Sequence, residues 1–303
     1  MKIVVAVDKS EESQQALRYT CHLLEHFTAI VDALYVKPDV VDSTEGAYAP
    51  FTTKSDVERT IEAEAEQTVE EIIESCSICV GGRIPCNPFV AIGDPADEIL
   101  NLANRDYYDM IVLGSQGRSM LRGLLLGTVH AKILHHARQP VLILRNFRPI
   151  QKILVAYRGS QCDQGALEFI APLFAKKKPE ITVLHVQETE RGESEEFADA
   201  CLMTGDETLR HYGYTPVKKM AKGDFVDEIL KAVAVERYDL LVLGAYGHQR
   251  PKYLKMLSDE AINLVRPDFA KVLVITHLEE LKDAFPARIE VEKTPEGSRV
   301  HVI

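Results

Sequence analysis

The sequence of 303 residues lacks any signal that would place the chain in or across a membrane. No apolar run approaches the roughly 20 residues that a membrane-spanning helix needs. Charged residues interrupt the opening MKIVVAVDKSEES, so it offers no basic segment followed by an apolar run and a small-residue cleavage site. We therefore expect a cytoplasmic protein with no membrane partner.

Clusters of basic residues are also missing. The chain holds 35 Lys and Arg against 46 Asp and Glu, which gives a formal net charge of -11. Binding to the phosphate backbone of a nucleic acid needs clustered positive charge. We therefore expect no nucleic-acid partner.

Cysteine is scarce, and its six copies lie mostly within predicted helices and strands. This usage predicts reduced thiols rather than a disulfide framework. Cys76, Cys79 and Cys86 have the spacing C-x2-C-x6-C near the end of a predicted helix. No second Cys-x2-Cys pair or suitably spaced His follows. The spacing is therefore only a weak indication of a zinc site or of a redox pair. We expect buried or idle thiols there.

Standard catalytic and nucleotide signatures are absent as well. There is no GxxxxGK followed by Ser or Thr, and no GxGxxG after the first predicted strand, which argues against a P-loop enzyme and a dinucleotide Rossmann domain. No Ser, His and Asp set and no pair of carboxylates can be recognised as catalytic. We expect His130 to be a surface residue, and we assign no catalytic residue.

The sequence contains an internal duplication. KIVVAVDKSEESQQAL (2–17) aligns without a gap on KILVAYRGSQCDQGAL (152–167), and GDPADEILNLANRDYYDMIVLGSQG (93–117) aligns on GDFVDEILKAVAVERYDLLVLGAYG (223–247). The second copy is shorter between its second and third strands. The repeat predicts two domains of the same fold.

We divide the chain into a first copy (1–148), a second copy (149–276) and a C-terminal extension (277–303). The extension holds a helix candidate, LEELKDAF, and two alternating runs around KTPEGS that predict a hairpin. We expect this hairpin to complete the edge of a domain or of a dimer. The polar, aperiodic segment 38–54 predicts a long loop or lid.

Short β-branched runs alternate with segments of helical period in each copy. In the first copy they predict helices over 11–27 and 57–75, the second opened by a capping box of Ser55 and Glu58. The strands are predicted at 2–8, 31–37, 86–92, 109–114 and 140–145. This order predicts an α/β protein with two tandem, open-twisted, five-stranded parallel sheets, each with helices on both faces.

Glycines follow the fourth strand of the first copy, in the stretch GSQGRSMLRGLLLGTV (114–129). Ligands of open parallel sheets bind beyond the carboxyl ends of the strands, and the loops after Val7, Val36 and Leu113 leave the sheet at that edge. Thr128 is a good N-cap for the helix that follows, whose free backbone amides could bind an anion. A glycine-rich turn with an ordinary Thr cap explains the spacing equally well.

The spacing G-x2-G-x9-G-S/T in this stretch resembles the nucleotide motif of the universal stress protein family. The resemblance covers about residues 1–276, through VAVDKSEES, GDPADEIL, DMIVLGSQG and QPVLIL. It implies a Rossmann-like fold of the adenine nucleotide alpha hydrolase-like type and dimers joined through the last strand. In one subclass of the family it also implies bound ATP or AMP.

The resemblance also implies which residues meet the nucleotide. Asp8 and Val36 match positions that meet the adenosine part, Ala6 stands where some members have a proline, and Leu113 and Gly114 match ribose-side positions. The family positions around the phosphates are matched by Gly117, Gly127, Thr128 and Val129. Arg118 and Arg122 lie in the spacer and could reach phosphate oxygens.

Asp8 has the chemistry that this role requires. A carboxylate could accept hydrogen bonds from ribose hydroxyls or the adenine amine, or hold Mg²⁺ near the phosphates. The alternative is an Asp that only shapes the entry to a helix.

The second copy departs from the motif. Arg158 replaces Asp8, Leu257 replaces Gly127 and Tyr157 replaces Val7, whereas Gly244, Gly247, Ser258 and Val186 keep the pattern. A leucine should obstruct the approach of backbone to phosphate. We expect one competent nucleotide site per chain and a second copy that acts as a built-in dimer partner, although Arg158 and Ser258 leave room for another anion.

These observations predict an ATP- or AMP-binding stress-response regulator, present as a homodimer or as an intramolecular pseudo-dimer. Hydrolysis should be slow at most, since only Arg118 and Arg122 could stabilise a transition state. Two alternatives stay open. One is an ATP-dependent enzyme on the same fold whose further substrate pocket comes from the loop 38–54. The other is an interaction module that binds no nucleotide.

Overall fold

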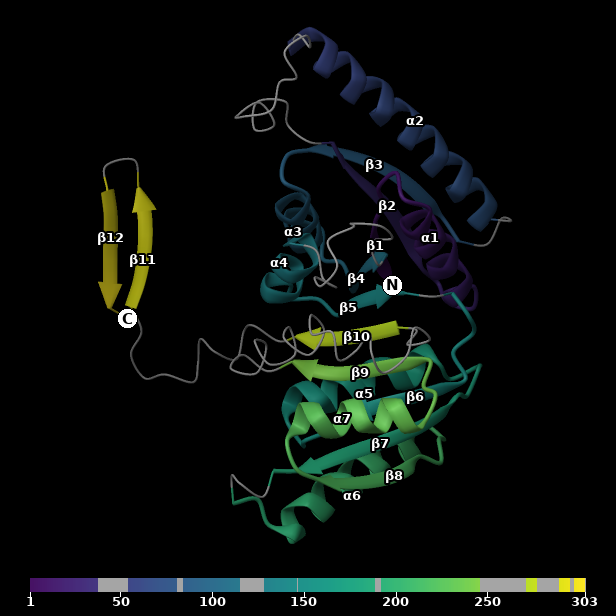
Figure 1. Ribbon diagram of the computed structural model, residues 1–303, viewed down its shortest axis with the longest axis vertical. Helices are drawn as coiled ribbons and strands as arrows, with labels where there is room; N and C mark the ends of the chain where they lie inside the picture. The colour runs from purple at the N-terminus through teal and green to yellow at the C-terminus, as the bar shows by residue number, and fades with distance from the viewer. Residues whose placement is uncertain are drawn as a thin grey trace.

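Two five-stranded parallel sheets join edge to edge in the computed structural model of the chain (Figure 1). The strand order of the resulting ten-stranded sheet is β3-β2-β1-β4-β5-β10-β9-β6-β7-β8. The structure describes residues 1–37, 54–80, 84–114, 128–145, 147–188, 192–245, 271–276, 289–294 and 297–302.

The first copy supplies five strands and four helices to this sheet. In chain order they are β1 (Lys2–Ala6), α1 (Glu11–Leu23), β2 (Ile30–Lys37), α2 (Lys54–Val80), β3 (Cys86–Ile92), α3 (Pro95–Arg105), β4 (Met110–Gly114), α4 (Thr128–His136) and β5 (Val141–Leu144). All neighbouring strands of this copy pair in parallel. The α/β fold predicted for this copy is confirmed.

The second copy repeats the order. Its described elements are β6 (Lys152–Ala156), α5 (Gln161–Leu173), β7 (Glu180–Gln187), α6 (Glu195–His211), β8 (Val217–Lys222), α7 (Phe225–Val235), β9 (Leu240–Ala245) and β10 (Lys271–Thr276). Its strands also pair in parallel, and the two copies meet where β10 pairs antiparallel with β5. The sheet therefore runs without a break from one copy into the other.

The duplication extends to the residues that begin the helices. Ser10 caps α1 and Ser160 caps α5, and each side chain accepts a hydrogen bond from the backbone N–H three residues later. Asp94 and Asp224 cap α3 and α7 in the same way. These side chains accept hydrogen bonds from amides that have no partner within the helix. Because the caps recur, each of these helices begins the same number of residues after its strand in both copies.

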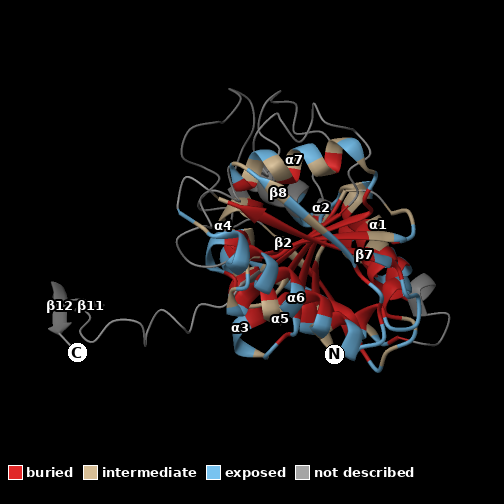
Figure 2. Ribbon diagram, turned by 90° about the horizontal axis from the view of Figure 1, so that it is seen from below, coloured by how far each residue is buried: buried red, intermediate tan, exposed pale blue. Residues whose placement is uncertain are grey.

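The core lies on both faces of the sheet. Ile3 and Val5 of β1 point to the face covered by α1, α2, α5 and α6, whereas Val4 points to the face covered by α3, α4 and α7. Figure 2 shows the buried residues gathered along the strands and the exposed residues on the outer sides of the helices. Each fully buried Val or Ile contributes roughly 1.5–3 kcal/mol. The apolar strand runs are thus explained by burial on both faces.

Three expectations about local structure are wrong. Helix α2 begins at Lys54, so Ser55 lies inside the helix and not at the N-cap position that the predicted capping box requires. The C-terminal hairpin is present as β11 (Ile289–Thr294) and β12 (Gly297–Val302), but the two strands form a sheet of their own. The expectation that they complete the edge of a domain is therefore wrong, and the alternative of a dimer edge stays a prediction. The loop at 38–53 and the helix candidate at 278–285 lie outside the described residues.

The third wrong expectation concerns the cysteines. Cys76 and Cys86 form a disulfide with a Cα–Cα distance of 5.2 Å. The last turns of α2 reach the first residue of β3, which brings together two thiols that we expected to be reduced. Cys21, Cys162 and Cys201 are buried thiols outside any disulfide, as expected. Within the described part of the chain, no helix is long and apolar enough to cross a membrane.

Candidate functional site

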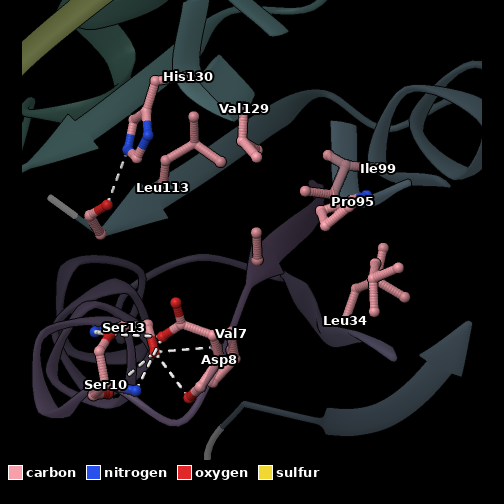
Figure 3. A pocket seen from close by; sticks show the side chains of 13 residues that line it. Val7, Asp8, Ser10, Ser13, Leu34, Pro95, Ile99, Leu113, Val129 and His130 are labelled. Atoms are coloured by element: carbon pink, nitrogen blue, oxygen red, sulfur yellow. Dashed lines mark hydrogen bonds between the residues drawn. The ribbon is translucent and has the colours of Figure 1, made fainter. Parts of the chain in front are cut away.

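A cavity of about 140 Å³ opens at the carboxyl ends of β1, β2 and β4 (Figure 3). This volume is about ten times what a single water molecule needs, so the cavity has room for a small organic group. Its lining residues are Ala6, Val7, Asp8, Ser10, Ser13, Leu34, Val36, Pro95, Ile99, Leu113, Gly114, Val129 and His130. The cavity lies at the sheet edge where ligands of open parallel sheets bind.

Most of the residues predicted from the sequence meet in this cavity. They are Ala6, Asp8, Val36, Leu113, Gly114 and Val129. Thr128 is the first residue of α4 rather than the cap before it, so the expectation of an N-cap is wrong by one position. Gly117, Arg118, Arg122 and Gly127 lie outside the described residues.

Asp8 is held in a tight turn at the start of α1. Its Oδ1 accepts hydrogen bonds from the Ser10 backbone N–H at 2.9 Å and from the Ser10 hydroxyl. Ser13 Oγ donates to the Asp8 carbonyl oxygen at 3.0 Å. Among the described residues Oδ2 of Asp8 has no hydrogen-bond partner, so an oriented carboxylate oxygen is left to accept a hydrogen bond from a hydroxyl or an amine.

Gly114 has a packing role that the sequence did not reveal. A Cβ at Gly114 would lie 2.9 Å from Ser13 Cα, and a Cβ at Gly244 would lie 2.3 Å from Asp163 Oδ1. Only glycine lets the end of the strand approach the first turn of the helix so closely. This need is the same in both copies, so Gly114 does not by itself indicate a ligand.

His130 lines the cavity, although we expected it at the surface. Its side chain is buried, and Nε2 lies 2.9 Å from the Gly114 carbonyl oxygen. That oxygen can only accept, so the neutral ring carries its proton on Nε2, and the buried Nδ1 has no hydrogen-bond partner in the part of the chain that the structure describes. Burial lowers the pKa of His130 below its usual value, an effect that the hydrogen bond to Gly114 partly offsets.

The helical period could have placed His130 correctly. Ile133, Leu134 and Ala137 are buried and lie three, four and seven residues after it, so His130 belongs to the inner stripe of α4. Sequence reasoning also missed the apolar wall formed by Leu34, Pro95 and Ile99. Pro95 and Ile99 are four residues apart and share one face of α3.

The cavity thus combines apolar walls with one polar side. Leu34 and Ile99 lie on the apolar side of the cavity, and Asp8, Ser10 and Ser13 lie on its polar side (Figure 3). Val36 also lines the cavity, and these apolar surfaces suit a flat ring. Pockets of this kind bind small molecules, with the apolar walls providing affinity and the polar groups fixing orientation.

The matching place in the second copy is filled by the chain itself. The Arg158 guanidinium lies 4.3 Å from the centre of the Phe225 ring, where the first copy has Asp8 and Pro95. Arg158 Nη1 also lies 3.4 Å from Glu188 Oε2, and both side chains are mostly buried. The charge of Arg158 is therefore already paired within the chain, and the expectation that Arg158 and Ser258 leave room for another anion stays a prediction. Ser258 lies outside the described residues.

The order of strands and the helices on both faces define a tandem α/β protein, and its first copy has a cavity at the carboxyl edge of the sheet. A family comparison agrees with this class: the Universal stress protein family matches residues 1–145 and 149–275. The matched segments span most of the chain, which therefore belongs to the universal stress protein family.

Individual relatives extend the comparison. The universal stress protein YxiE of Bacillus subtilis is 30% identical over 148 residues, which are 48% of this chain and 98% of that protein. The crystal structure of a universal stress protein from Archaeoglobus fulgidus covers 91% of this chain and 96% of its own, with a TM-score of 0.68 and 20% identity, a likeness of fold.

A third relative carries a ligand in its structure. It is a universal stress protein family protein from Arabidopsis thaliana with AMP bound, 25% identical over 48% of this chain and 92% of its own, with a TM-score of 0.34. That AMP belongs to the Arabidopsis protein and does not by itself assign a ligand to this chain.

Proposed function

We propose that the first copy, residues 1–148, binds an adenine nucleotide, ATP or AMP, and that the chain is a cytoplasmic stress-response regulator whose state depends on this ligand. The observation that carries the proposal is the cavity at the carboxyl ends of β1, β2 and β4. It unites the oriented Asp8 carboxylate with apolar walls at positions that the sequence had assigned to a nucleotide.

The residues of the cavity fit the parts of such a ligand. The walls formed by Leu34, Val36 and Ile99 suit the faces of an adenine ring, and Asp8 Oδ2 suits a ribose hydroxyl. The first amides of α4, which begins at Thr128, suit a phosphate, because the start of a helix attracts anions. On the phosphate side we also propose Gly117, Arg118 and Gly127, and this part of the proposal rests on the sequence alone.

A divalent cation would enter with the nucleotide. Among the described residues no group of three or more His, Cys, Asp or Glu is placed to hold a metal. Asp8 is the single carboxylate among the described residues that line the cavity, which suits Mg²⁺ bound chiefly by phosphates and water. One carboxylate and a His130 ring tied to Gly114 supply little for hydrolysis, so any ATPase activity should be slow.

The second copy, residues 149–276, would serve as the partner of the first within one chain. Three features support this role: the β5–β10 pairing joins the two copies, Arg158 and Phe225 fill the second site, and Leu257 replaces the last glycine of the motif. We infer one nucleotide site per chain and an intramolecular pseudo-dimer. Residues 277–303 would be an extension outside both copies.

The test uses one variant in each copy. Ligand released from denatured wild-type protein is identified by mass spectrometry, and AMP and ATP are then titrated into Asp8→Asn and Arg158→Ala. Asp8→Asn should weaken binding by about tenfold, because an amide cannot replace a charge-assisted acceptor. Arg158→Ala should bind as wild type. Equal binding by Asp8→Asn and wild type, or loss of binding in Arg158→Ala alone, would contradict the proposal.

A further inference from the structure

The disulfide between Cys76 and Cys86 fastens the end of a long helix to the sheet. Helix α2 runs for 27 residues and ends beside β3, where Cys86 is the first residue. Cys76 is 5% exposed, whereas Cys86 is only partly buried. The other described cysteines, Cys21, Cys162 and Cys201, are buried and form no disulfide. Cys86 is therefore the more exposed residue of the pair, and a reagent in solution meets it before the buried cysteines described.

The bond lies next to a polar contact between α2 and α1. Ser75 Oγ donates a hydrogen bond to Gln14 Oε1 at 2.8 Å, and Arg18 Nη2 donates to Ser75 Oγ at 3.2 Å. Both Ser75 and Gln14 are buried. A covalent bond at Cys76 restricts the backbone of its neighbour Ser75, so the state of the sulfurs affects how firmly the end of α2 is held on α1.

We propose that Cys76 and Cys86 form a site of reversible thiol–disulfide exchange whose reactant is a low-molecular-weight disulfide. The reduced form is the one expected under the reducing conditions of a resting cytosol, and the disulfide forms when oxidised small thiols accumulate. In the oxidised form the end of α2 is fixed to β3.

The exchange proceeds in two balanced steps. The Cys86 thiolate attacks one sulfur of the small disulfide, the S–S bond of that molecule breaks, and one small thiolate leaves and takes up the proton that Cys86 lost. Cys76 then loses its proton and attacks the Cys86 sulfur of the mixed disulfide, and the second small thiolate leaves with that proton. Two electrons pass from the two protein thiols to the small disulfide, which becomes two thiols.

The exchange is tested on the full chain in buffers of reduced and oxidised glutathione. Thiols are trapped by alkylation and located by peptide mass spectrometry. We expect Cys76 and Cys86 to change state together and reversibly without denaturant, and Cys79→Ser to behave as wild type. Cys76→Ser should stop at a mixed disulfide on Cys86. The proposal is overturned if Cys76 pairs with Cys79, if the two thiols stay unpaired in oxidised glutathione, or if the bond resists reduction in the folded protein.

The effect on α2 has its own measurement. Amide hydrogen exchange over residues 70–80 should be slower in the oxidised than in the reduced protein, because the bond removes local opening of the last turns. A Cys76→Ser, Cys86→Ser double variant should exchange at the reduced rate in both buffers. Equal rates for oxidised and reduced wild type would overturn the claim that the bond holds α2.

Discussion

Lys271 gives the sharpest prediction about how the two copies hold together. It begins β10 with its side chain fully buried, and Nζ donates to the Arg148 carbonyl oxygen at 2.8 Å. The ammonium lies 4.7 Å from the centre of the Tyr19 ring on α1, so it joins the second copy to a helix of the first. Burial lowers the pKa of Lys271 to about 8, with Asp239 opposing the shift and Arg148 adding to it.

The lowered pKa makes stability depend on pH in a definite direction. An unfolded lysine has a pKa of about 10.4, so between pH 8 and 10.4 the unfolded chain binds more protons and the free energy of unfolding rises with pH. From pH 7 to pH 9 the rise due to Lys271 is about 1.3 kcal/mol. Burial raises the pKa of Tyr157 and of Tyr214 to about 12, so in the folded chain both ionise above this range.

Urea denaturation at pH 7 and pH 9 measures this rise. Lys271→Met removes the titrating group. From pH 7 to pH 9 the free energy of unfolding should therefore rise by about 1.3 kcal/mol less in Lys271→Met than in wild type. The exposed control Lys176→Met should keep the wild-type dependence. The reasoning is refuted if wild type and Lys271→Met show the same dependence on pH.

Three further predictions concern the cavity. Burial lowers the pKa of His130, so the protein should lose stability as pH falls below about 6.5, and His130→Gln should reduce that loss in thermal denaturation at pH 7 and pH 5. Gly114→Ala should cost about 1–3 kcal/mol in urea denaturation, because its Cβ would meet Ser13 Cα at 2.9 Å, and an unchanged midpoint would contradict that packing. Val36→Phe should narrow the cavity and weaken AMP binding at least about tenfold while the melting temperature stays near wild type, and undiminished binding would place the ligand elsewhere.

The parts of the fold that depend on local pattern could be predicted from the sequence. The strand runs of β1, β2 and β4 are apolar because both faces of the sheet are covered, and the duplicated caps Ser10 and Ser160 recur at equal spacing. Asp8 and Gly114 were identified through the resemblance to the universal stress protein family.

Most of the wrong expectations concern contacts between residues in different elements. Periodicity and motif spacing do not predict such contacts. Cys76 meets Cys86 only because the long helix α2 ends at the start of β3. His130 is a different case, because its helical spacing to the buried Ile133 and Leu134 would have placed it on the inner side of α4. The contact between Arg158 and Phe225 at the second site joins two residues that are far apart in the sequence. Neither substitution, considered alone, indicates this contact.

The most direct test of the central claim is calorimetric titration of AMP and ATP into wild type and into Gly127→Leu, which gives the first copy the residue that the second copy has at Leu257. The account predicts one site per chain in wild type, and no binding in Gly127→Leu with an unchanged circular dichroism spectrum. Two equal sites per chain, no binding by wild type, or wild-type affinity in Gly127→Leu would contradict it.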